Sequence, residues 1–467
     1  MTVDAQNAAS PETWLWFEQA LLDTGWAQSV RIGLRNGLID VILTGAVAEP
    51  GDHIHVTGVP GLSNLHSHAF QRGMAGLAEA RGPSRDSFWT WRETMYRFVD
   101  RLRPDEVAAI AAMAFAEMLE GGFTRVAEFH YLHHDLDGQP YGNVAEMAEA
   151  IAAAAAETGI ALTLLPVFYA HSGFGGAAPA EPQRRFVNDL NGFHRLMQAS
   201  ERAISILPDG VIGVAPHSLR AVTREELGVV CGMTRGPVHI HIAEQVREVD
   251  DCLVWSGARP VDLLFDTVEV DRRWCLVHAT HMSASETWRL TNSGAVAGLC
   301  PITEANLGDG IFPAAAYLAA GGVWGVGSDS NVLIDAAQEL RMLEYSQRLG
   351  ERSRNVMADE AGGSTGGAMF RAALAGGAQA AGDSVSHGLA VGQVADLVAL
   401  ANESGADERV FGDVRLDQWI FASRDRRVDA VWRRGGQVVR NGRHVAHAET
   451  TRRYARVLAR ILDLGNA

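Results

Sequence analysis

The fold is decided by the stretch Val59-Pro60-Gly61-Leu62-Ser63-Asn64-Leu65-His66-Ser67-His68, an apolar run that closes on two histidines. Side chains two residues apart on a strand project to the same face, so His66 and His68 point the same way. If this is the first strand of a barrel, both imidazoles lie at its C-terminal mouth, where a divalent metal can bind. An isolated pair of this spacing is weak evidence. His53-Ile54-His55 repeats it, and without companions at matching positions we interpret that second pair as structural.

The first pair gains weight from polar residues that end three later apolar runs, namely His241 with Glu244, His278, and Asp329. The expected metal ligands are His66, His68, His241 and Asp329. We expect one divalent metal, Zn²⁺ in the simplest case, although such a site also accepts Fe²⁺ or Mn²⁺. Glu244 lies just past its strand end, where a carboxylate that is not a ligand can shuttle protons. The competing interpretation of Asp329 is a helix N-cap, a role that Ser330 could fill instead.

Two choices between neighbouring histidines depend on where each strand ends. His278 closes its strand whereas His281 already lies in the following loop, so we expect His278 to reach the centre. His239 alternates with His241 on one strand, and we expect it to be a packed core group beside the ligand.

Eight short apolar strands alternate with helical segments between Leu62 and Asp329. The expected strands are Leu62–His66, Arg125–His130, Ala161–Phe168, Val211–Ala215, Val238–Ile242, Cys275–His278, Ala295–Cys300 and Val323–Val326. The expected helices are Asp105–Glu120, Val144–Thr158, Gln183–Ile206, Arg224–Cys231, Pro260–Phe265, Ala284–Asn292 and Ala314–Ala320. Eight β/α alternations over about 270 residues predict an α/β protein with a (β/α)8 TIM barrel. A doubly wound open sheet is the competitor, but a barrel gathers polar strand ends from the whole series into one site.

The two ends of the chain predict a second, smaller domain. Strand-like pieces occur at Val30–Leu34 and Leu38–Leu43, and again at Ala395–Leu400, Val428–Arg433 and Gln437–Arg440. Neither flank is long enough for a stable sheet alone, so we expect them to build one small β-sandwich domain together. The expected boundaries are residues 1–58 and 385–445 for this domain, 59–384 for the barrel, and 446–467 for a C-terminal helix.

Composition narrows the partners and the compartment. A formal charge of −16 argues against nucleic acid or an anionic membrane as the main partner, but it leaves room for a small anionic substrate. Four cysteines occur singly, which is typical of reduced thiols in a cytoplasmic protein. We expect no signal peptide in Met1–Glu12, which lacks an apolar region, and no membrane span. A homodimer is expected only from the general frequency of two-fold assemblies.

An arginine at the predicted mouth indicates a carboxylate-binding position. Arg220 follows the fourth strand, and a guanidinium there can hold a carboxylate with two parallel hydrogen bonds. It could equally pair with a nearby acid at the surface. Arg92, on the long first loop, is a second candidate for the same task.

Taken together, these residues resemble the amidohydrolase superfamily. The shared pattern is His-x-His on the first strand, histidines on the fifth and sixth, and aspartate on the eighth. The segment His241-Ile242-Ala243-Glu244 is similar to the mononuclear deaminase branch. A binuclear member would carry a bridging lysine at the end of strand four, where this chain has Pro216-His217-Ser218, and that departure favours one metal.

More narrowly, the chain resembles the formimidoylglutamate deiminase family over nearly its whole length. The matching segments are Glu128–His134, Ala215–Arg220, His239–Gln245 and Cys300–Gly310. The resemblance implies hydrolysis of N-formimino-L-glutamate to N-formyl-L-glutamate and ammonia in histidine degradation. It also implies that Asp329 and His278 take the proton of the attacking water and that Glu244 protonates the departing nitrogen. The implied substrate contacts are Arg220, Arg92 and Tyr131 at the carboxylates, and Gln71 and His217 at the reacting end.

Two other classes of function stay open at this stage. A hydrolase of the same fold could act on a purine, a triazine, or another amidine or guanidine. For a ring substrate, it would need an apolar stacking slot in place of the arginines. A metal-binding barrel without turnover is the second alternative, and a panel of substrates separates all three.

Overall fold

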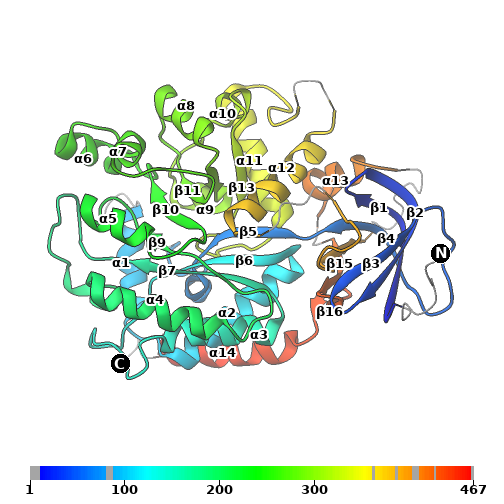
Figure 1. The fold of residues 1–467 in the computed structure, drawn as a ribbon, viewed down its shortest axis with the longest axis horizontal. Coiled ribbons are helices and arrows are strands. Elements are labelled where there is room, and N and C mark those ends of the chain that lie inside the picture. The colour runs from blue at the N-terminus through cyan, green and yellow to red at the C-terminus, as the bar shows by residue number, and fades with distance from the viewer. Residues whose placement is uncertain are drawn as a thin grey trace, which may run out of the picture.

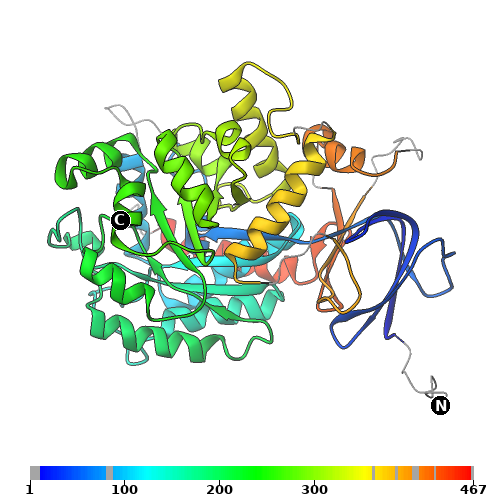
Figure 2. The ribbon, with the colours of Figure 1, turned by 45° about the horizontal axis from the view of Figure 1, so that its top comes forward.

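The computed structural model describes residues 11–79, 88–359, 363–383, 388–401, 410–424 and 427–463 (Figures 1 and 2). The segment Met1–Glu12, predicted to carry no signal peptide, lies outside the described residues except for its last two. Among the described residues, no helix is both long and apolar enough to cross a membrane.

Parallel strands close into a barrel, as predicted. One sheet contains β5 (Leu62–Ser67), β6 (Phe123–His130), β7 (Ala161–Phe168) and β8 (Val211–Ile212), with β9 (Ala215–Pro216) paired to β7. The other contains β10 (Val238–Ile242), β11 (Trp274–His278), β12 (Val296–Leu299) and β13 (Val323–Val326). Parallel bridges between Val214 and Val238, and between Ser67 and Asp329, join the two sheets at both edges. The second of these bridges brings two predicted metal-binding strand ends side by side.

Helices follow the strands and surround the barrel (Figure 1). Their bounds are η1 (Ala69–Met74), α1 (Phe88–Val99), α2 (Pro104–Glu120), α3 (Glu146–Thr158), η2 (Glu181–Gln183), α4 (Leu190–Ile204), α5 (Arg224–Cys231), α6 (Val246–Ser256), α7 (Pro260–Thr267), α8 (Ala284–Ser293), α9 (Pro301–Leu307), α10 (Ala314–Ala319), α11 (Ala336–Glu351) and α12 (Thr365–Ala380). Local sequence explains several starts. In α5, for example, Thr223 and Glu226 form a reciprocal capping box that satisfies backbone N–H groups at the N-terminus.

The predicted helix Gln183–Ile206 is wrong in its first turns, because α4 begins only at Leu190. The cause is a tertiary contact that helix propensity does not record. The guanidinium of Arg185 is buried and donates to the backbone carbonyls of Val99, Leu102 and His134. These bonds hold the chain before α4 in an irregular path across the barrel mouth.

The two ends of the chain build the small β-domain at one side of the barrel (Figure 2). Its strands are β1 (Thr13–Leu22), β2 (Gly25–Arg35), β3 (Leu38–Leu43), β4 (His53–Pro60), β14 (Leu397–Leu400), β15 (Val428–Arg433), β16 (Gly436–Arg440) and β17 (Arg443–His444). They form one continuous sheet in the order β17-β16-β15-β14-β4-β1-β2-β3 around its own apolar core. The antiparallel pair of β4 with β14 is where the N-terminal and C-terminal flanks meet.

The C-terminal segment returns to the barrel. After the short α13 (Val414–Asp417) and η3 (Gln418–Ala422), the chain ends in α14 (His447–Asp463), which packs along α2 (Figure 1). The buried carboxylate of Glu120 accepts hydrogen bonds from the His444 amide and from His447 Nδ1, and so anchors the start of this helix.

Candidate metal centre and active-site cavity

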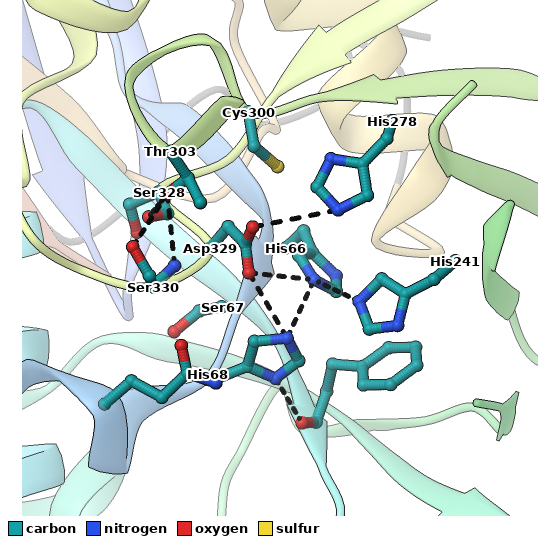
Figure 3. A network of polar contacts seen from close by, with 12 residues as sticks. His66, Ser67, His68, His241, His278, Cys300, Thr303, Ser328, Asp329 and Ser330 are labelled. Atoms are coloured by element: carbon teal, nitrogen blue, oxygen red, sulfur yellow. Dashed lines mark hydrogen bonds and ion pairs between the residues drawn. The ribbon is translucent and has the colours of Figure 1, made fainter. Parts of the chain in front are cut away.

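Three imidazole rings converge where β5 and β10 end (Figure 3). The Nε2 atom of His66 lies 3.2 Å from Nε2 of His68 and 3.0 Å from Nε2 of His241. Asp329 Oδ1 completes the group, at 3.5 Å from His66 Nε2 and 3.2 Å from His68 Nε2. Four donor atoms from three strand ends therefore face one point, and all four side chains are buried.

This set of donor atoms fits a divalent metal. His68 Nδ1 donates to the backbone carbonyl of Phe129 at 3.0 Å, so its Nε2 carries the lone pair that a metal needs. Burial lowers the pKa of His66 to about 3, which keeps that imidazole neutral. Around a tetrahedral ion with ligand distances of about 2.0–2.1 Å, the ligand atoms lie about 3.3 Å apart. The spacings of 3.0–3.5 Å match that value.

Backbone hydrogen bonds fix Asp329 beside the first strand. Its amide donates to the His66 carbonyl and its carbonyl accepts from the His68 amide, both at 2.9 Å. Asn331 Nδ2 donates to the His68 carbonyl at 3.0 Å. Gly327 permits this approach, because a Cβ there would lie 2.6 Å from His66 N. Burial opposes ionisation of Asp329, yet its contacts with His66 and His68 hold its pKa well below the usual value.

The strand ends that carry the site have unusual backbone conformations. Residues with positive φ here are Ala243 (50°), His278 (69°), Ala279 (49°), Asp329 (43°) and Asn331 (56°). Residues other than glycine rarely adopt this left-handed region, and each such residue costs about 1–3 kcal/mol. Such strain persists only where surrounding contacts impose it, and it clusters at functional sites.

Glu244 and His278 lie on the open side of the histidine cluster. His278 Nε2 lies 3.7 Å from Glu244 Oε1 and 3.8 Å from Asp329 Oδ2. Burial alone would lower the pKa of His278, but the carboxylates of Glu244, Glu304 and Asp329 outweigh it and raise the pKa to about 10. Burial raises the pKa of Glu244, and His278 and Arg220 offset only part of that effect. The pair is therefore placed to exchange a proton beside the histidine cluster.

A second group of potential ligand atoms comprises His278, Cys300 and Asp329 (Figure 3). Burial raises the pKa of the Cys300 thiol well above its usual value, whereas the ligand form of cysteine is the thiolate. Asp329 also belongs to the first group. The three imidazoles therefore offer the better metal site.

A cavity of about 680 Å³ opens above the cluster. Every predicted site residue except His66 lines it: His68, Gln71, Arg92, Tyr131, His217, Arg220, His241, Glu244, His278 and Asp329. His66 lies beneath, fully buried. The structure thus brings the whole predicted set into one site.

Arg220 and Arg92 face the same aromatic ring from different elements. Arg92, on α1, lies over the Trp89 ring at 4.6 Å from guanidinium carbon to ring centroid, and Arg220 lies at 5.9 Å. Arg220 is partly buried between two acids, with Nη2 4.0 Å from Glu244 Oε2 and Nη1 3.9 Å from Glu248 Oε2. Its Nη1 has no hydrogen-bond partner among the described residues. A partly buried guanidinium with a free donor that lines a cavity is suited to an anionic substrate group.

The remaining predicted contacts lie around the ligand histidines. Gln71 Nε2 donates to the Tyr131 hydroxyl at 2.7 Å, and the Tyr131 ring centroid lies 5.0 Å from that of His68. The His217 ring lies 5.0 Å from the His241 ring, with His217 Nδ1 3.2 Å from the hydroxyl of Ser218. These polar atoms border the part of the cavity nearest the histidine cluster.

Sequence reasoning missed four residues of the site: Trp89, Arg247, Glu248 and Glu304. Three arginines lie over the Trp89 ring, since Arg247 joins Arg92 and Arg220 there at 4.7 Å from guanidinium carbon to ring centroid. Glu248 is fully buried and accepts from the Glu244 amide at 3.1 Å, one helical turn away. The i, i+4 spacing of Glu244 and Glu248 could have indicated Glu248 from the sequence. Glu304 reaches the site from a different helix, α9.

The histidines assigned to other roles lie away from the metal point. His55 Nδ1 is 2.9 Å from Asp429 Oδ2 within the small β-domain. His239 Nε2 donates to the Ala380 carbonyl at 2.8 Å, and His281 Nε2 donates to the Asp309 carbonyl at 2.8 Å.

Comparison with known proteins gives a consistent result. Residues 57–439 match the Amidohydrolase family, and residues 13–56 match the family described as Formimidoylglutamate deiminase HutF, N-terminal domain. A formimidoylglutamate deiminase of Pseudomonas aeruginosa is 48% identical over 452 residues, covering 96% of this chain and 99% of the relative. Among solved structures, an amidohydrolase from Brucella melitensis has a TM-score of 0.92 at 54% identity, covering 97% of this chain and 100% of its own. An adenosine deaminase from Xanthomonas campestris, solved with bound zinc, shares the fold at a TM-score of 0.79 and 22% identity, covering 97% and 99%.

Proposed function

The chain belongs to the amidohydrolase family, and from this membership we propose that it hydrolyses N-formimino-L-glutamate to N-formyl-L-glutamate and ammonia. It is a hydrolase of C–N bonds other than peptide bonds. The observation that best supports this substrate is the near full-length similarity to a formimidoylglutamate deiminase. A cavity with two arginines beside the histidine cluster supports it, because the substrate carries two carboxylates and an amidine.

We propose one divalent metal per subunit, Zn²⁺, held by His66, His68, His241 and Asp329. When bound, such a metal supplies a water acidified toward neutrality. Asp329 Oδ2 lies 3.8 Å from His278 Nε2, and a bound Zn²⁺ would favour the neutral form of His278, so these two groups would receive the water proton. Burial raises the pKa of Glu244, which favours its acid form, and Glu244 would deliver its proton to the nitrogen that leaves as ammonia.

At the other end of the substrate, Arg220 would bind one carboxylate, with Arg92 and Tyr131 assisting. Gln71 and His217 would border the formimino group. We further propose a cytoplasmic homodimer, and we keep the boundaries 1–58 with 385–445, 59–384, and 446–467 as the proposed domains.

The test measures ammonia release from N-formimino-L-glutamate by protein stripped of metal and then reloaded with one equivalent of Zn²⁺. We expect no turnover without metal and restored turnover with it, with N-formyl-L-glutamate as product. A purine and a triazine serve as matched ring substrates and should be inert. Bound zinc with turnover of a ring substrate alone would refute the proposed substrate, and failure to bind zinc would refute the ligand set.

A further inference from the structure

Glu304, a buried carboxylate that has no role in the proposed mechanism, contacts His278, which does have one. Glu304 lies on α9, the short helix after β12, and its side chain is almost entirely buried. Its Oε1 atom lies 3.2 Å from His278 Nδ1. The same oxygen accepts a hydrogen bond from the Cys300 amide at 2.8 Å, which fixes the carboxylate in place.

The direction of this contact determines which ring nitrogen carries a proton. An ionised carboxylate only accepts hydrogen bonds, so His278 Nδ1 must be the donor. The opposite nitrogen, Nε2, then faces Glu244 Oε1 at 3.7 Å and Asp329 Oδ2 at 3.8 Å. A ring turned over about its Cβ–Cγ bond would offer Glu304 a carbon instead of Nδ1. The contact therefore selects the ring orientation, and in the neutral imidazole it places the proton on Nδ1 and leaves Nε2 free.

We propose that Glu304 is a positioning residue of the reaction, which holds His278 with Nδ1–H bound and Nε2 aimed at the gap between Glu244 and Asp329. This inference rests on the proposed function, because it assigns the step that Glu304 supports. The charged groups that face His278 are Glu244, Asp329 and Glu304. A hydrogen-bonded carboxylate behind a catalytic histidine is a common way to fix its orientation.

The hydrogen bond to Glu304 also restrains the strained backbone of His278. His278 and Ala279 both have left-handed φ angles, 69° and 49°. A strained residue at a strand end returns toward ordinary conformations unless its surroundings hold it. The hydrogen bond to Glu304 is one such restraint, and it acts on the side chain whose position matters.

The chain offers a matched control in Glu339 on α11. Glu339 is fully buried, and its Oε2 accepts from the Ile302 amide at 3.0 Å, so it anchors the same end of α9 as Glu304 does. Among the described residues, it makes no hydrogen bond to His278. Comparing Glu304→Leu with Glu339→Leu therefore separates the loss of the histidine contact from general loosening of α9.

The kinetic test uses the zinc-loaded enzyme with N-formimino-L-glutamate. We expect Glu304→Leu to lower kcat by about 10–100-fold with unchanged KM and zinc content. Glu304→Gln should recover much of that loss, because its amide oxygen can still accept from Nδ1–H. Glu339→Leu should keep a kcat near that of the parent. An equal fall of kcat in Glu304→Leu and Glu339→Leu overturns the proposal.

A spectroscopic test needs no turnover. The Nδ1 proton of His278 is followed by ¹H–¹⁵N NMR with labelled histidine, and its resonance is assigned by its loss in His278→Asn. We expect this resonance in the parent and in Glu304→Gln, and its shift or disappearance in Glu304→Leu. If the leucine variant does not fold, Glu304→Asp keeps the charge but withdraws the acceptor, and it should show the same change. An unchanged Nδ1 resonance in the variant measured overturns the proposal, whereas a parent inert toward the substrate overturns only the proposed function.

Discussion

Replacing Arg220 by methionine separates substrate binding from charge balance inside the cavity. The side chain lies 3.9 Å from Glu248 Oε2 and 4.0 Å from Glu244 Oε2. At such distances each attraction amounts to about 4 kcal/mol at an effective dielectric constant near 20. Glu248 is fully buried, so its carboxylate would lose its nearest cation. Removing the counter-charge of this buried carboxylate should cost about 1–3 kcal/mol, less than for a fully buried and hydrogen-bonded pair, and we expect Arg220→Met to lower the melting temperature accordingly.

The same substitution removes the donor proposed for a substrate carboxylate. A hydrogen bond to a charged group contributes about 1.5–3 kcal/mol. Converted at about 1.4 kcal/mol per factor of ten, kcat/KM should fall by roughly ten- to a hundredfold. The assay is ammonia release from N-formimino-L-glutamate at substrate concentrations below KM, with zinc content measured in parallel.

A double variant makes the interpretation refutable. In Arg220→Met with Glu248→Gln, the amide oxygen can still accept from the Glu244 amide while the uncompensated charge is gone. We expect the melting temperature to recover and kcat/KM to stay low. Recovery of kcat/KM in the double variant would show that Arg220 serves only as a counter-ion, and parent-like kcat/KM in Arg220→Met would remove it from the carboxylate site.

Three further substitutions test Glu244 as the proton donor, the close approach of two strands at Gly327, and the buried His130. Glu244→Gln should abolish ammonia release yet retain zinc by atomic absorption, and loss of zinc would contradict its assignment as a group that is not a ligand. Gly327→Ala should weaken zinc binding about 10–100-fold in chelator competition, since its Cβ would meet His66 N at 2.6 Å; the helix control Gly228→Ala, with no neighbouring atom within 4 Å, should not. Burial lowers the pKa of His130 to about 3, whereas the unfolded chain has an ordinary histidine pKa near 6.5. Between these two values only the unfolded chain binds the proton, so the free energy of unfolding falls as the pH falls. At pH 5 this term amounts to about 2 kcal/mol relative to pH 7, and thermal unfolding of His130→Leu should lose less stability on acidification than the parent; an equal loss would contradict the assignment.

The barrel could be predicted from sequence because its strands are buried on both faces and read as short apolar runs. β7, β10 and β13 have the predicted bounds. The fourth strand is the exception, since the predicted Val211–Ala215 is divided into β8 and β9. Gly213 lies at the division, where a Cβ would meet Leu165 Cδ2 at 2.5 Å and Pro237 O at 2.6 Å. Periodicity records burial, but it does not record such close approach of neighbouring chain segments.

Most of the predicted site residues share a property that sequence can express, because they lie at or just after the end of a strand, whereas Arg92 lies on α1. Glu304 and Trp89 do not share this property. Glu304 reaches His278 from α9, and Trp89 reaches the cavity from α1, so their roles depend on how helices pack over the barrel mouth. A pattern of strand ends indicates which side chains meet at the metal, whereas the groups that orient them come from elements whose placement is tertiary.

The left-handed residues explain why the site could be located but its geometry could not be predicted. Alanine has no preference for positive φ and histidine is only enriched there among uncommon cases, so the sequence does not mark Ala243, His278 or Ala279 as left-handed. Their conformations are imposed by hydrogen bonds between neighbouring strand ends, since the Ala279 amide donates to the Ile242 carbonyl at 3.1 Å and the His281 amide to the Ala243 carbonyl at 3.0 Å. These left-handed residues redirect the chain where β10 and β11 end, and so they determine where the side chains of Glu244 and His278 point. The closed barrel therefore does more than gather the proposed catalytic residues, because its strand pairing holds them in conformations that an isolated strand would not keep.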